Sequence, residues 1–184
     1  MKKIFLALLL CCVQSVFAQS DTKAKSSETS KLSKFESFIG GDYSIKNRGT
    51  NFRSANLSFT YSPFKVIGAQ VETRGDLMLH HRDGRHWDDA TVVGGGLRLR
   101  LTKEVFSVLN DAEIPRIDVI ATMGSTIDGD FNHTYYDGRI SCYPLESCKN
   151  FAFTIGYRHY NMHNDVFGKY DFFYMGIAYK MNLF

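Results

Sequence analysis

The stretch that decides the fold is "VIGAQVETRGDLMLH", residues 66–80. Its odd-numbered positions, from Ile67 to Leu79, carry no charge, whereas its even-numbered positions include Glu72, Arg74 and Asp76. A period of two residues predicts a β-strand with two unlike faces. The fold therefore depends on which of these faces meets water.

The same alternation recurs along the chain and predicts further strands. Six more segments keep their uncharged residues in one phase: 35–45, 55–61, 91–101, 117–127, 151–157 and 173–183. An eighth strand is needed if both ends of the array are to lie on one side, and "HTYYDGRIS" (133–141) is the candidate. The pattern predicts an all-β, eight-stranded antiparallel up-and-down barrel.

Periodicity alone leaves two barrels open, because both have a period of two. In a soluble barrel the uncharged faces turn inward, and in a transmembrane barrel they turn outward to lipid. The expected strands run roughly 10–13 residues, and about 9–11 tilted residues cross a bilayer. Aromatic residues, which suit the boundary between lipid and water, crowd the strand ends. They are Tyr43, Tyr61, Phe64, Trp87, Tyr135, Tyr136, Phe151, Tyr160 and Tyr170.

The first residues predict export. Lys2 and Lys3 precede an apolar run over 4–13, and Val16 and Ala18 fit a cleavage site before Gln19. We therefore expect a signal peptide over 1–18, a flexible polar leader over 19–33 and a barrel domain over 34–184. Without Lys2 and Lys3, the 22 basic residues fall to 20 against 19 acidic ones, so no nucleic-acid partner is expected.

Two cysteines remain after cleavage, in "SCYPLESCKN". In an exported protein Cys142 and Cys148 predict a disulfide that closes a small loop. A metal half-site is the alternative, although no further cysteine supports it.

With its export signal, alternating strands and the ending "GIAYKMNLF", the chain resembles the small bacterial outer-membrane β-barrel proteins of OmpX-like and OmpA-like architecture. The resemblance covers about residues 34–184. It implies a monomer in the bacterial outer membrane, in contact with membrane lipid. It also implies that the outer-membrane insertion machinery recognises the C-terminal strand with its final Phe184.

If the uncharged faces meet lipid, the charged faces line the barrel interior. An eight-stranded barrel is just wide enough for side chains to fill it, and buried charges must pair. The sequence thus predicts a closed, salt-bridged interior that supports the fold. The expected polar network comprises Glu36, Asp42, Glu72, Arg74, Asp76, Arg98, Arg100, Asp118 and Arg158.

Residues with possible chemistry are few. All six histidines fall near one predicted rim: His80, His81, His86, His133, His159 and His163. They could bind zinc or copper, or simply be solvated loop residues; no cofactor is expected. Ser125 and Ser141 are conceivable nucleophiles, without supporting spacing. The triple glycine at 94–96 lies inside a strand, so it predicts relief of crowding rather than a phosphate loop.

These observations favour a non-enzymatic outer-membrane barrel with a structural or surface-interaction role, in which loops contact an extracellular partner. Two alternatives stay open. A secreted lipocalin-like carrier would have an apolar interior and a charged exterior. A lipid A-modifying enzyme would show a cluster of His, Ser and an acid at its outer rim.

Overall fold

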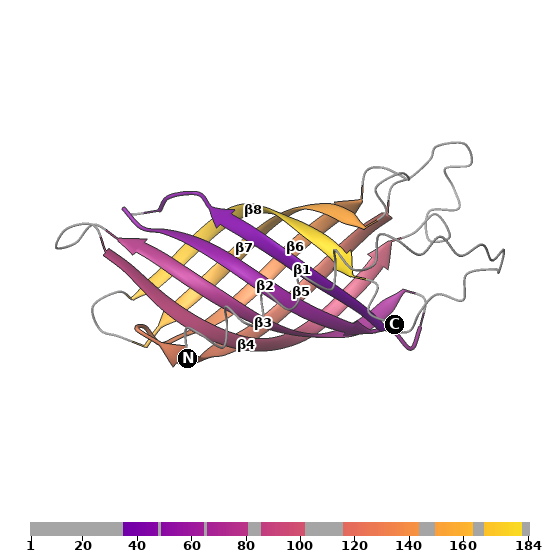
Figure 1. Ribbon diagram of the computed structural model, residues 1–184, viewed down its shortest axis with the longest axis horizontal. Coiled ribbons are helices and arrows are strands. Elements are labelled where there is room, and N and C mark those ends of the chain that lie inside the picture. Colours follow the sequence, from indigo (N-terminus) through magenta and orange to yellow (C-terminus); the bar gives the residue numbers. More distant parts are fainter. Residues whose placement is uncertain are drawn as a thin grey trace, which may run out of the picture. The chain divides into compact units, whose positions relative to one another are not determined.

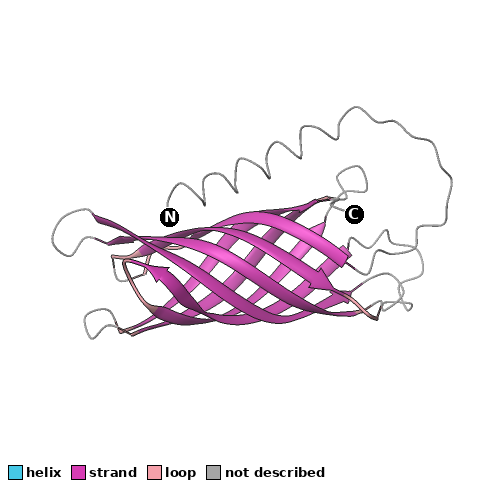
Figure 2. Cartoon of the chain, turned by 60° about the horizontal axis from the view of Figure 1, so that its bottom comes forward, coloured by secondary structure: helices cyan, strands magenta, loops and turns pink. Residues whose placement is uncertain are grey.

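A computed structural model describes residues 35–47, 49–64, 66–80, 86–101, 116–143, 150–163 and 168–181. The predicted signal peptide and the predicted polar leader lie outside these residues. Every described regular element is a strand, and the eight strands close into one barrel (Figures 1 and 2). The strands are β1 (Phe35–Ser44), β2 (Asn51–Tyr61), β3 (Ile67–His80), β4 (His86–Leu101), β5 (Arg116–Gly129), β6 (His133–Tyr143), β7 (Phe151–Met162) and β8 (Lys169–Met181).

Each strand pairs antiparallel with its neighbours in the chain, and β1 pairs with β8 to close the sheet. The closing ladder runs from Ser37 opposite Met181 to Ser44 opposite Tyr174. The predicted eight-stranded antiparallel barrel is therefore confirmed, including its sixth strand, which extends the predicted segment by two residues to Tyr143. No helix of the described residues is long and apolar enough to cross a membrane.

The connections alternate between two ends of the barrel. Residues 62–66, 102–115 and 144–150 connect strands at the end where β1 begins, here called the Phe35 end. Residues 45–50, 81–85, 130–132 and 163–168 connect strands at the opposite end, here called the His133 end. Connections divide in this way in any up-and-down barrel, because strand order follows chain order throughout.

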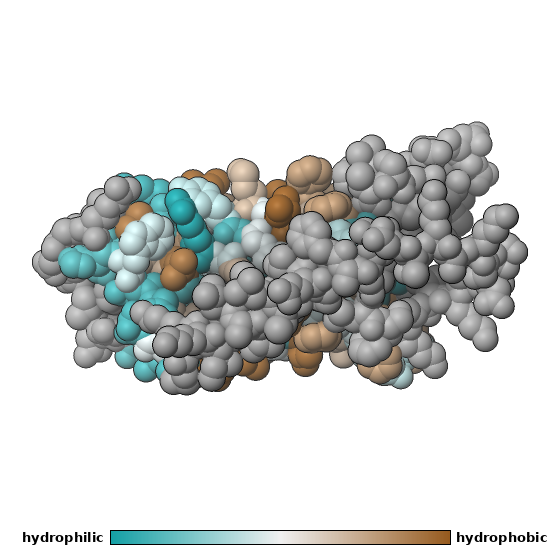
Figure 3. Space-filling model, viewed as in Figure 1, coloured by the Kyte–Doolittle hydropathy of each residue, from teal (hydrophilic) through white to brown (hydrophobic). Residues whose placement is uncertain are grey.

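The outer face carries no charged side chain over most of its height. Among the described strands, charge appears on this face only within four residues of the His133 end, at Arg53, Asp89, Asp128, Lys169 and Asp171. In Figure 3 hydrophilic residues gather at that end, on the left, and hydrophobic residues lie over the middle of the barrel. Large apolar side chains of the uncharged part of this face, such as Leu97 and Phe153, are more than 60% exposed. The charged face of β3 accordingly points inward.

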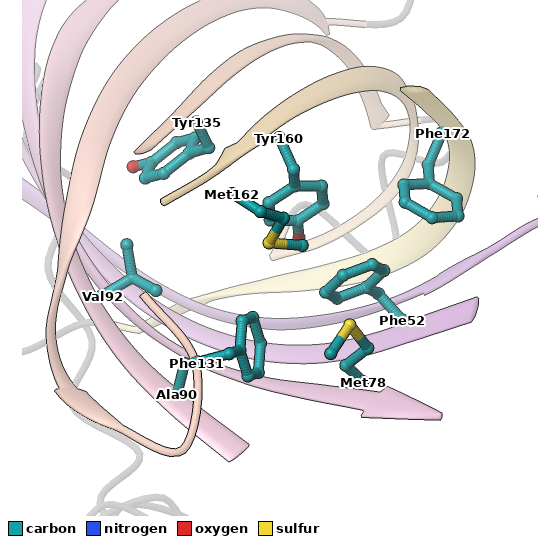
Figure 4. Packing of buried hydrophobic residues seen from close by; sticks show 9 residues of the cluster. All are labelled: Phe52, Met78, Ala90, Val92, Phe131, Tyr135, Tyr160, Met162 and Phe172. Carbon is teal, nitrogen blue, oxygen red and sulfur yellow. The ribbon is translucent and has the colours of Figure 1, made fainter. Parts of the chain in front are cut away.

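The barrel interior near the His133 end holds an aromatic plug (Figure 4). In it the Phe52 ring stacks on Tyr160 with centroids 4.3 Å apart and meets Phe172 edge-on at 4.9 Å. The residues of the plug are Phe52, Met78, Ala90, Val92, Phe131, Tyr135, Tyr160, Met162 and Phe172.

The prediction that Tyr135 and Tyr160 lie at a lipid boundary is wrong. Both side chains are buried inside the barrel, and Tyr170 packs against the same plug. The reason is parity, because Tyr135 and Tyr160 alternate in phase with the inward-facing residues of β6 and β7. By contrast Tyr43, Tyr61, Trp87, Tyr136 and Phe151 are more than 40% exposed, as is Phe64 in its connection.

Candidate functional site

The charged interior is the candidate site, and its residues occupy inward positions on seven of the eight strands, all except β2. The structure places all nine predicted network residues inside the barrel, each side chain nearly excluded from solvent. Because buried charge is stable only when paired, the arrangement of partners decides what this interior can do. The charges form two groups along the barrel axis.

The first, the Phe35-side ionic group, contains Glu36, Arg98, Arg100, Arg116, Asp118 and Lys180. At its centre Glu36 accepts hydrogen bonds from cations on three other strands. Lys180 Nζ donates at 2.6 Å and Arg116 Nη2 at 3.1 Å, and Arg100 also donates. One carboxylate thus joins β1 to β4, β5 and β8.

Asp118 is the second carboxylate of this group. Arg116 holds it with two hydrogen bonds, Nε–Oδ1 at 3.0 Å and Nη2–Oδ2 at 2.7 Å. Arg98 and Arg100 approach it less closely, at 3.6 and 3.9 Å. The planar fork of arginine suits such two-point contact, so Arg116 is its principal partner.

The second, the central ionic group, contains Asp42, Glu72, Arg74, Asp76, Asp137, Arg139 and Arg158. Glu72 lies at its centre and receives Arg139 Nη2 at 2.5 Å and the Tyr135 hydroxyl at 2.8 Å. Thr122 and Gln70 also donate to it, each at 3.1 Å. Four protein donors thus replace the water molecules that would otherwise hydrogen-bond to this buried carboxylate.

The remaining carboxylates of the central group are also held. Arg74 donates twice to Asp76, at 2.7 and 3.2 Å, and its guanidinium lies 4.0 Å from the centre of the Tyr135 ring. Arg158 donates twice to Asp42, at 3.2 and 3.0 Å. These contacts fill the interior with fixed charge.

Several members of the network were not in the predicted set. Asp137 on β6 receives Arg139 Nη1 and the Tyr174 hydroxyl, each at 2.8 Å. Arg116 and Lys180 also lie outside the predicted set, although both pair with Glu36. The signal for Asp137 and Arg139 was their spacing of two residues, which puts both on one face of β6.

Little space remains between the side chains. One cavity lies between the two ionic groups, with room for about one water molecule. Its lining includes the side chains of Phe38, Ser58, Arg98, Arg139 and Ser141. The described interior is therefore packed with side chains rather than hollow.

The described histidines lie near the His133 end, as predicted, but they do not all meet at one point; His80 and His86 are neighbours, with ring centroids 5.8 Å apart. His80 contacts Asp88 at 2.9 Å, His133 contacts Asp76 at 3.3 Å and His159 contacts Asp171 at 2.7 Å. No group of three or more metal-binding side chains occurs among the described residues; His81 is not among them. Each of these three histidines instead has its own carboxylate.

The candidate nucleophiles are not placed beside a base. Ser141 lies inside the barrel, where its hydroxyl meets that of Thr154 at 3.0 Å. The Ser125 hydroxyl donates to the backbone carbonyl of His133 at 3.3 Å. Neither arrangement is that of an activated serine.

Cys142 lies half-buried on the outward face of β6, and the structure shows no disulfide at this residue. Cys148 lies outside the described residues. The disulfide between them therefore stays a prediction.

Glycines relieve crowding inside the barrel, beside aromatic side chains at Gly94 and Gly156 and beside the backbone of Ala121 at Gly96. Gly94 and Gly96 face inward, and a Cβ on Gly94 would overlap the Tyr135 hydroxyl. Gly156 makes the same allowance for the ring of Tyr174. The predicted relief of crowding is what the interior requires at these positions.

No protein-family model matches this chain, and no curated protein matches it either. Among solved structures, it is similar to Ail, the attachment invasion locus protein of Yersinia pestis, crystallised with the heparin analogue sucrose octasulfate. The identity is 14% over 80% of this chain and 97% of that chain, with a TM-score of 0.46. A second structure, the outer membrane protein Ail in a phospholipid bilayer nanodisc, has 17% identity over 79% and 99%, with a TM-score of 0.45.

Proposed function

We propose that this chain is a bacterial outer-membrane protein that spans the bilayer as a monomeric, closed barrel. The observation that carries the proposal is the division of charge between the two faces of the sheet. The outer face is uncharged over most of its height, whereas the inner face pairs its carboxylates with arginine and lysine. A bilayer accepts a closed barrel because every backbone group within it is paired.

The packed interior supports a structural role rather than transport. A soluble carrier of an apolar ligand needs an apolar interior and a charged exterior, and this barrel has the reverse. The described residues also lack the His, Ser and acid cluster expected of a rim-located lipid A-modifying enzyme. The role we propose is therefore envelope support and contact with an extracellular partner.

The His133 end is the part that we assign to surface contact. There the outer face becomes charged and the exposed side chains include Trp87 and His86. Strands that continue beyond the uncharged band stand in water, where a partner can reach them. We propose that this end faces the cell exterior.

Fractionation tests the membrane assignment. Membranes that carry the full chain are washed with carbonate, and the protein is run on a detergent gel with and without boiling. We expect it to stay with the outer membrane and to change mobility on boiling. Recovery in the soluble fraction with a single mobility would refute the proposal.

Surface labelling of intact cells tests the orientation. A short epitope is inserted between residues 163 and 168 in one variant and between 144 and 150 in a matched variant. We expect antibody to label only the first on intact cells and both after lysis. Labelling of only the second on intact cells would reverse the assignment of the two ends.

A further inference from the structure

The two ionic groups have unequal charge. In the described interior, the Phe35-side ionic group has four cations but only two carboxylates. The central ionic group has three arginines and four carboxylates. Excess positive charge therefore lies on one side of the cavity between the groups.

Solvent can stabilise some of these cations by hydration but not all of them. The side chains of Arg116 and Lys180 are 21% and 24% exposed, so water reaches both. Arg98 and Arg100 are each 4% exposed. Of these two, Arg100 has Glu36 as a direct partner, whereas Arg98 shares only Asp118, which Arg116 already holds.

Arg98 is thus a buried cation without a carboxylate of its own. Its one described hydrogen bond goes from Nη1 to Thr60 Oγ1 at 3.3 Å, and its Nε has no hydrogen-bond partner among the described residues. The Phe38 ring covers it with a centroid distance of 3.9 Å. A buried hydrogen-bond donor without an acceptor is unfavourable, and so is a buried charge without a counter-charge.

The cavity beside Arg98 has room for the counter-charge and the hydrogen-bond acceptor that this side chain lacks. Its charged lining residues are Arg98, Arg139 and Asp42, of which Asp42 already receives two hydrogen bonds from Arg158. The buried hydroxyl residues Ser58 and Ser141 also line it. With two guanidinium groups and one carboxylate, the lining has one net positive charge, and it has hydroxyl donors around a space of about one water molecule. Water would satisfy the Nε donor but would leave the charge in excess, and a phosphate or an organic carboxylate would be too large.

We propose that the barrel interior binds one monovalent anion of halide size, held by Arg98 in this cavity. The anion supplies the negative charge that the Phe35-side ionic group lacks. It would make the stability of the folded barrel depend on the kind of anion present, as well as on ionic strength.

The first test uses the unaltered protein, so no variant has to fold. Crystals of the full mature chain are grown in bromide, and the anomalous signal of bromine is mapped. We expect one peak inside the barrel, in contact with the Arg98 guanidinium. An empty cavity, or a carboxylate of the chain beside Arg98 Nε in the same map, would overturn the proposal.

The second test measures linkage. The unfolding midpoint in detergent is followed while chloride replaces gluconate at constant ionic strength. A ligand that binds only the folded state raises stability with its concentration, so chloride should raise the midpoint progressively. A midpoint that is the same in both salts would contradict a bound halide, and a crystal peak alone would then mark binding at crystal concentration only.

Variants assign the effect to Arg98. R98Q should abolish the chloride dependence, and R98K should retain it because the charge remains. R53Q is the matched control, since Arg53 lies on the outer face near the His133 end and is remote from the cavity. If R98Q shows the same chloride dependence as R53Q, Arg98 does not hold the anion.

Discussion

The hydroxyl group of Tyr135 occupies the space that a Cβ atom on Gly94 would need. This contact joins β4 to the inward face of β6, and the same hydroxyl donates to Glu72 at 2.8 Å. The glycine, the aromatic ring and the central ionic group are thus one packing unit. A substitution at any of them should therefore alter the packing or the hydrogen bonds of the others.

Replacing Gly94 by alanine should therefore destabilise the barrel. Overpacking of a filled interior typically costs about 1–3 kcal/mol, and here the new methyl group would displace a tyrosine from a buried hydrogen bond. Urea unfolding, followed by the mobility of unboiled samples, measures the change. Gly95→Ala is the control, because its nearest obstacle lies at an ordinary contact distance of 3.4 Å. Equal stability of the two variants would show that Tyr135 does not constrain position 94.

An arginine on the outer face tests contact with lipid. Leu97 lies within the uncharged band and is 62% exposed, so Leu97→Arg should cost roughly 2–4 kcal/mol at the bilayer midplane and impair assembly. Ile127 is similarly exposed but lies near the His133 end, two residues before β5 ends. Ile127→Arg should consequently cost less. The amount of heat-modifiable protein in the outer membrane measures both, and normal assembly of Leu97→Arg would place that face away from lipid.

Removing the charge of Glu72 should be costly because Arg74 and Arg139 would lose a common partner. Breaking a buried ion pair from one side typically costs about 3–5 kcal/mol. We expect Glu72→Gln to lower the free energy of unfolding by roughly 3 kcal/mol in the same urea assay. Asp128→Asn, at an exposed position of β5, makes the same chemical change and should stay within about 0.5 kcal/mol. A mild effect at Glu72 would mean that water, rather than protein, solvates these arginines.

The predicted disulfide is tested by alkylation of the mature protein after denaturation. Without reductant, neither Cys142 nor Cys148 should react, and after reduction both should, with a corresponding increase in mass. Cys142→Ser is the control and should leave one reactive thiol in either condition. Two reactive thiols in the exported, unreduced protein would show that the pair is not oxidised.

How far the sequence predicts this fold depends on how clearly each strand separates its two faces. In β3 the charges Glu72, Arg74 and Asp76 alternate with uncharged residues, and its inward face was predictable at once. In β6 the outward positions include Thr134 and Gly138, so little apolar contrast marks the strand. This strand was predicted only because an even number of strands places both ends of the array on one side of the barrel. Its inward-facing residues Asp137 and Arg139 were not predicted as members of the polar network.

The interior pairing was beyond sequence reasoning for a different reason. Alternation assigns a side chain to a face, but partners such as Arg158 and Asp42 are 116 residues apart and meet only through the closure of the sheet. The wrong prediction for Tyr160, which was expected at the lipid boundary, has another cause. It was assigned by residue type, although its parity with Arg158 already pointed inward.

The position of Glu36 has a consequence for the order of folding. Its three cationic partners lie 64, 80 and 144 residues further along the chain. Contacts of such long range form slowly, because the intervening chain must be ordered first. Glu36 therefore completes its bonds only when the last strand joins the first. Until that moment Lys180 and Glu36 remain hydrated, and the final step of assembly is also the one that removes them from water.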